Sequence, residues 1–104
     1  MRSLPRERRA SPRWKAPGGS YARFPEGASA IADIGFGGLR IDDSDPLPEG
    51  TRLDMRLHLC EQIIPCVGVV RRCVPGKSMG IRFVGFPEGE LNRLRSVLFE
   101  LRGR

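Results

Sequence analysis

The chain has 104 residues, with 18 Lys and Arg against 12 Asp and Glu and a formal net charge of +6. This length gives one domain with one modest core, and 13 Gly with 9 Pro suit a turn-rich β protein better than a helical bundle. No apolar run approaches the roughly 18 residues of a membrane-spanning helix, and no hydrophobic stretch follows the N-terminal arginines, so we expect neither a transmembrane segment nor a secretory signal.

The positive charge is concentrated at the N-terminus. Residues 1–15 contain one acidic residue, Glu7, and six basic ones: Arg2, Arg6, Arg8, Arg9, Arg13 and Lys15. Residues 1–19 combine Arg, Pro, Ser and Gly without an apolar period, which predicts a flexible basic tail ahead of a folded domain at residues 20–104. Arginine forks onto phosphate and onto the O6/N7 edge of guanine, so the tail indicates an anionic partner. A tail that only aids solubility is the alternative.

Two features of this tail carry specific chemistry. Arg9 and Arg13 form an RxxxR pattern, which is a weak signal by itself in a segment so rich in arginine. Trp14 follows at once, and its indole either anchors the tail on the domain or stacks on a base.

Six strands and one helix are predicted along the rest of the chain. The strands are expected at residues 20–24, 28–34, 39–41, 51–59, 63–73 and 79–84. The clearest is 51–59, where aliphatic side chains alternate with Arg, Asp and His, as in a strand with one buried face. Leucines and a valine at helical spacing, with acidic residues before them and basic residues after, predict a C-terminal helix at about 88–102. We expect this helix to cover an open end of a sheet or barrel.

The stretch 30–41 is predicted to form a strand, a glycine-rich turn and a second strand. Asp33 lies near the end of the first strand, beside Gly35, Gly37 and Gly38. Glycines let a ligand approach the main chain closely, and a carboxylate beside exposed backbone N–H groups can meet a donor-rich group such as the Watson–Crick edge of guanine. The alternative is an ordinary hairpin turn with a surface aspartate.

Metal and catalytic sites are not predicted. His58 with Cys60, Cys66 and Cys73 offers four zinc-binding side chains, but their separations follow no zinc-site spacing. We expect buried, reduced thiols in a cytoplasmic protein instead. The acidic loop 42–50 lacks the spacing of an EF-hand and is expected to be solvated. Because neither a nucleophile–base pair nor a carboxylate dyad emerges, we predict no enzymatic activity and no cofactor.

Four motifs in this order are similar to those of one family. They are RxxxR at Arg9 and Arg13, the run Asp33-Ile-Gly35-Phe-Gly-Gly38, the run Gly68-Val-Val-Arg71, and Met79-Gly80-Ile-Arg-Phe83 ahead of the closing helix. From about Arg8 to the C-terminus, the chain resembles the PilZ domain, a bacterial receptor for cyclic di-GMP. The resemblance implies a small six-stranded antiparallel β-barrel (a split barrel) with a C-terminal helix, which agrees with the strand count above.

The resemblance also implies a binding site for cyclic di-GMP. Arg9 and Arg13 would contact guanine edges and phosphates from the flexible tail, and Asp33 and Gly38 match the family's (D/N)xSxxG motif, which holds a guanine. Gly35 stands where that motif has serine. The missing hydroxyl costs about 0.5–1.5 kcal/mol, and up to about 3 if a buried donor is left unpaired, so binding would be a few-fold to roughly 100-fold weaker. The secondary candidates for ligand binding are Arg8, Trp14, Arg40 and Arg71.

The function implied is that of a cyclic di-GMP effector without catalysis. Its arginine tail would close over the dinucleotide, and the reshaped surface would signal to a protein partner in trans. One alternative is a PilZ-fold adaptor that has lost the ligand, with Gly35 as the sign of that loss, and acts through protein contacts. A second is a small basic barrel that binds nucleic acid, which we disfavour because no predicted strand carries the paired aromatic residues of a base-stacking sheet.

Overall fold

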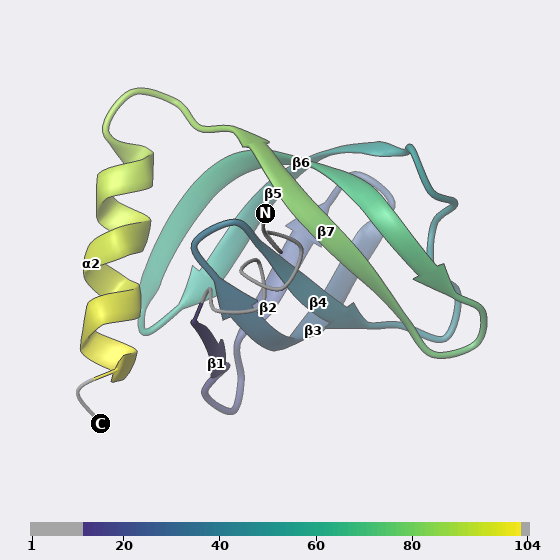
Figure 1. Cartoon of the computed structure of the whole chain (residues 1–104), viewed down its shortest axis with the longest axis horizontal. Coiled ribbons are helices and arrows are strands. Elements are labelled where there is room, and N and C mark those ends of the chain that lie inside the picture. The colour runs from purple at the N-terminus through teal and green to yellow at the C-terminus, as the bar shows by residue number, and fades with distance from the viewer. Residues whose placement is uncertain (1–11, 103–104) are drawn as a thin grey trace, which may run out of the picture.

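The computed structural model describes residues 12–102, which form seven strands and a C-terminal helix (Figure 1). The elements are β1 (Arg13–Lys15), β2 (Tyr21–Phe24), β3 (Gly27–Gly35), β4 (Gly38–Asp42), β5 (Arg52–Leu59), β6 (Gln62–Val74), β7 (Ser78–Gly85) and α2 (Glu90–Arg102). Arg8 and Arg9 lie outside the described residues, as do residues 1–11 as a whole.

Six of these strands close a barrel by antiparallel pairing. Their order is β3-β2-β5-β6-β7-β4, and a further pairing between β3 and β4 joins the two ends (Figure 1). The prediction of a six-stranded antiparallel β-barrel with a C-terminal helix is therefore confirmed. Each strand limit lies within one residue of the expected one. Alternating burial locates the middle of a strand well but marks its two ends less sharply.

The barrel interior is filled by aliphatic side chains that alternate along the strands. In β5 every second residue is buried, and the charged residues between them are exposed, as the pattern predicted. Cys66 is also buried, and this burial raises the pKa of its thiol to about 12, so the sulfur stays neutral. Cys60 and Cys73 are only partly buried. Within residues 12–102, no three or more His, Cys, Asp or Glu side chains gather as metal ligands would.

Helix α2 stands beside one end of the barrel and shares its core (Figure 1). It begins after Gly89, whose φ of 84° ends the preceding turn, and Leu94, Val97 and Leu98 are buried in the same cluster as the strand residues. Arg93 donates from Nη2 to Oε1 of Gln62 at 2.8 Å and so fixes the helix to the start of β6. In the part of the chain that is described, no helix has the length and apolar character needed to cross a bilayer.

Strand β1 was not expected from the sequence. It pairs antiparallel with the end of β3, with Arg13 opposite Gly35 and Lys15 opposite Asp33. The predicted flexible tail at residues 1–19 is therefore corrected for residues 13–15. A strand of three residues is too short to show a period, and its backbone hydrogen bonds come from an edge of β3 that lies far away in the sequence.

At Gly38 two strands of the barrel wall lie too close together for a side chain on β4. This glycine lies opposite Arg82, and a Cβ at this position would overlap the carbonyl oxygen of Ile81 on β7. Because that oxygen belongs to the main chain of a paired strand, a side chain at residue 38 must push β4 and β7 apart. Glycine is needed here for packing, whatever further role it has.

We expect Gly38→Ala to lower the free energy of unfolding by about 1–3 kcal/mol, the usual cost of forcing atoms into filled space. Urea unfolding followed by circular dichroism measures this change. Gly37→Ala is the matched control, since a Cβ there meets no atom within 4 Å. Equal stabilities for the two variants would contradict this account of Gly38.

Candidate functional site

A cavity of about 710 Å³ opens beside β1, between the loop that follows it and the middle of β3. One wall of the cavity is the loop that joins β1 to β2. Lys15 pairs with Asp33 and Tyr21 pairs with Ala30, so residues 16–20 lie opposite residues 31–32 alone. The extra residues turn outward through Pro17-Gly18-Gly19, where Gly19 has a φ of 90°. Residues 13–20 and 30–33, together with Arg40 and Asp42, line the cavity.

Asp33 faces outward toward this cavity because β3 carries an irregularity. Ile31 pairs with Ile41 and Asp33 with Arg40, so Ala32 is an extra residue in β3. Strict alternation would put Ile31 and Asp33 on the same face. The shift instead allows Ile31 and Ile34 to be buried together and leaves Asp33 partly exposed between them. The pairing of β3 with β4 thus decides where the carboxylate points.

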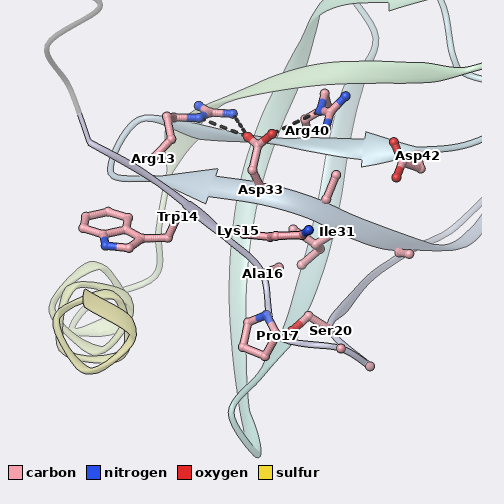
Figure 2. Close-up of a pocket in the computed structure, with 14 residues that line it drawn as sticks. Arg13, Trp14, Lys15, Ala16, Pro17, Ser20, Ile31, Asp33, Arg40 and Asp42 are labelled. Carbon is pink, nitrogen blue, oxygen red and sulfur yellow. Dashed lines mark hydrogen bonds and ion pairs between the residues drawn. The ribbon is translucent and has the colours of Figure 1, made fainter. Parts of the chain in front are cut away.

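Two arginines from different strands hold the Asp33 carboxylate. Arg13 on β1 donates from Nε to Oδ1 at 3.1 Å and from Nη2 to the same oxygen, and Arg40 on β4 donates from Nε to Oδ2 at 3.1 Å. Figure 2 shows the two guanidinium groups reaching the carboxylate from opposite sides. The side chains of Arg13 and Arg40 are about half exposed, at 47% and 51%, so solvent weakens both ion pairs.

Trp14 lies on the other face of β1, away from this ion-pair cluster (Figure 2). Its ring packs edge-on against Phe36 with the centroids 5.3 Å apart, and Phe36 in turn lies 5.8 Å from Phe99 of α2. Trp14 thus packs on the domain, in agreement with the anchoring alternative, and its stacking on a base stays a prediction. Alternation along three residues sends Arg13 and Lys15 to the cavity and Trp14 to the helix.

Of the seven predicted site residues that lie within residues 12–102, the structure brings four to the same cavity. Arg13, Asp33 and Arg40 line the cavity around one ion-pair cluster. Trp14 also borders the cavity, although its ring packs against Phe36. Gly35 lies at the end of β3 beneath β1, where an added Cβ would meet the carbonyl oxygen of Pro12 at 2.7 Å.

Two further candidates for ligand binding lie away from the cavity, one primary (Gly38) and one secondary (Arg71). Gly38 lies against β7, as described above, and Arg71 is exposed on β6 and does not line the cavity. Arg8 and Arg9 fall outside residues 12–102.

Three polar residues that line the cavity were missed in the sequence: Lys15, Ser20 and Asp42. A signal existed for two of them. Asp42 follows Arg40 at an interval of two residues and shares its exposed face of β4, and Lys15 has the same relation to Arg13 on β1. Ser20 had no such signal, because its place depends on the excursion between β1 and β2.

The cavity combines three cationic side chains with two carboxylates. Arg13, Lys15 and Arg40 offer donors suited to phosphate or to the acceptor edge of a base. Asp33 and Asp42 offer acceptors suited to a group with paired N–H donors. A ligand that carries both negative charge and a donor edge matches this lining better than an apolar molecule does.

Comparison with solved structures finds the same fold in proteins of low sequence identity. The Legionella protein Lpg0364 is 23% identical with a TM-score of 0.66, covering 88% of this chain and 94% of its own. YcgR from Escherichia coli in complex with c-di-GMP is 16% identical with a TM-score of 0.75, covering 92% of this chain and 46% of that one. The separate PilZ domain of YcgR with c-di-GMP is 16% identical with a TM-score of 0.74, covering 92% of each chain.

Sequence comparison agrees with this likeness in fold. No curated protein matches the chain. The family model of the PilZ domain matches residues 7–100, which is nearly the whole sequence. A barrel of six antiparallel strands with a C-terminal helix, matched over this length by the family model, shows that the chain belongs to the PilZ domain family.

Proposed function

We propose that this chain binds cyclic di-GMP in the cavity beside β1 and acts as a non-catalytic effector. The observation that carries the proposal is the carboxylate of Asp33, held between Arg13 and Arg40 at the edge of a cavity of about 710 Å³. Membership of the PilZ family supports it, as does the likeness in fold to two YcgR structures that contain c-di-GMP.

The chemistry of the cavity matches the parts of a cyclic guanine dinucleotide. The N1–H and N2–H donors of guanine suit the two oxygens of Asp33. The guanidinium groups of Arg13 and Arg40 suit either the phosphates or the O6/N7 edge of a base. The cavity volume lies within the range of about 300–1,000 Å³ that small-molecule sites usually have.

The tail contributes further arginines in this proposal. Arg9 precedes Arg13 by four residues, and we assign both to the ligand, with Arg8 as an additional positive charge. Gly35 and Gly38 remain proposed ligand contacts through their main chain. Arg71 has weaker support, because it does not line the cavity.

Strand β1 offers a route from the ligand to the outer surface. It carries Arg13 toward Asp33 on one face and Trp14 toward Phe36 on the other, and Phe36 contacts Phe99, which is 53% exposed on α2. A ligand that displaces the main chain of β1 moves Arg13 and Trp14 together, since both belong to the same short strand. We propose that the rearranged aromatic surface is what a protein partner recognises in trans.

Titration calorimetry with cyclic di-GMP tests the binding proposal, with GMP and single-stranded DNA as control ligands. We expect Asp33→Ala and Arg9→Ala each to weaken binding by about 10- to 150-fold, the equivalent of one lost charge-assisted hydrogen bond of roughly 1.5–3 kcal/mol. Arg52→Ala, an exposed arginine on β5 that does not line the cavity, should bind as the wild type does.

Each other outcome of this titration rejects the proposal in a different way. No heat with cyclic di-GMP at millimolar concentration would leave an adaptor that acts through protein contacts. Equal binding of all three ligands would indicate a nucleic-acid-binding barrel. Loss of the fold does not account for weak binding by Asp33→Ala, because exposed ion pairs contribute only about 0–1 kcal/mol to stability, and circular dichroism checks this.

The route through β1 predicts a change at the helix. Cyclic di-GMP should shift the backbone amide resonances of Phe36 and Phe99 in two-dimensional NMR spectra, because Trp14 moves against them. Trp14→Leu should still bind the ligand but should lose the shift at Phe99. Resonances of Phe99 that do not respond to saturating ligand in the wild type would contradict this route.

A further inference from the structure

Gly35 has no room for a side chain, although its backbone does not require glycine. A Cβ at this position would lie 2.7 Å from the carbonyl oxygen of Pro12 and 3.0 Å from Cδ of Arg13. Its φ lies outside the left-handed region, so other residues can adopt this backbone conformation without strain. The constraint at residue 35 is therefore space alone, and the atoms that occupy that space belong to Pro12, which precedes β1, and to Arg13, its first residue.

The contact that fills this space is the docking of β1 on β3. Arg13 lies opposite Gly35, and at the other end of β1 the amide of Ala16 donates to the carbonyl oxygen of Ala32 at 3.1 Å. The nearest atom to the added Cβ is a main-chain oxygen, which cannot rotate away as a side chain can. A larger residue at position 35 therefore forces the main chain at Pro12, immediately before β1, away from β3.

Docked β1 occupies the acceptor that a guanine would need. Oδ1 of Asp33 accepts hydrogen bonds from both Nε and Nη2 of Arg13, and Oδ2 accepts one from Nε of Arg40. Each carboxylate oxygen has two acceptor positions, so Oδ1 is full and Oδ2 has one left. The paired N–H donors of a guanine edge need one position on each oxygen. Arg13 must therefore leave Oδ1 before a base can bind Asp33 in this way.

We propose that Gly35 is the residue that lets β1 dock, and that docked β1 is a latch which keeps the Asp33 site closed by Arg13. The part of this proposal that concerns the ligand rests on the proposed function, whereas the docking part does not. If the missing serine hydroxyl alone weakened binding, Gly35→Ala would not raise the affinity, whereas the latch predicts that it does. Even alanine, which has no hydroxyl, should open the site and strengthen binding.

Amide hydrogen exchange of the ligand-free protein tests the docking. We expect Gly35→Ala to accelerate exchange at Ala16 by about 5- to 150-fold, which corresponds to the usual 1–3 kcal/mol cost of overpacking. Gly37→Ala is the matched control in the same turn. Its Cβ meets no atom within 4 Å and its φ is not left-handed, so Ala16 should exchange as in the wild type. Unchanged exchange in Gly35→Ala would overturn the proposal.

Calorimetry with cyclic di-GMP then tests the latch. Under the latch proposal, binding needs undocked β1 just as exchange at Ala16 does, so the affinity of Gly35→Ala should rise by the same factor as the exchange rate of Ala16. Gly35→Ser should bind at least as tightly as Gly35→Ala, and Arg52→Ala, a change outside the cavity lining, should bind as the wild type does. The Gly35 variants give a cleaner test than Arg13→Ala, which removes the latch and a proposed ligand contact at once.

The outcomes separate this proposal from the proposed function. Faster exchange with unchanged or weaker affinity in Gly35→Ala would show that β1 docks through Gly35 but does not act as a latch. Absence of binding by the wild type and by all variants at millimolar cyclic di-GMP would reject both the proposed function and the latch. The exchange rates would still decide whether Gly35 permits docking.

Discussion

The pairing of β3 with strands on both of its edges is the constraint on which the rest of the structure depends. On one edge β3 pairs with β2 and then with β1, and on the other it pairs with β4 and closes the barrel. Asp33 lies where these pairings meet, opposite Lys15 on one side and Arg40 on the other. The charged cluster exists because barrel closure brings three strands to one point.

The interactions that hold β1 are weak enough to be exchanged for a ligand. This strand has three residues, and its ion pair with Asp33 is partly exposed, which limits the contribution to stability to about 0–1 kcal/mol. Its other anchors are the backbone pairing with β3 and the edge-on contact between Trp14 and Phe36. The barrel core beneath, by contrast, is built from fully buried aliphatic residues. A rigid barrel with one loosely held strand is the arrangement that a switch requires.

Two glycines of one turn have different physical reasons to be glycine. Gly38 lies against the main chain of β7, so a side chain there would open the barrel wall. Gly35 lies against the main chain of Pro12 and the side chain of Arg13, so a side chain there would press only on a short edge strand and the residue before it. The first affects global stability, whereas the second affects the equilibrium at the site. Gly37, between them, is free of both constraints.

The sequence by itself determined the strands of the barrel and the closing helix, because alternation and helical spacing are local patterns that burial imposes. It also predicted Arg13, Asp33 and the glycine-rich turn as a candidate site. Only the tertiary structure decided that residues 13–15 form a strand, that an extra residue at Ala32 turns Asp33 outward, and that Arg40 joins Arg13 on its carboxylate. These features depend on register and on pairing between residues far apart in the chain, which a local pattern does not encode.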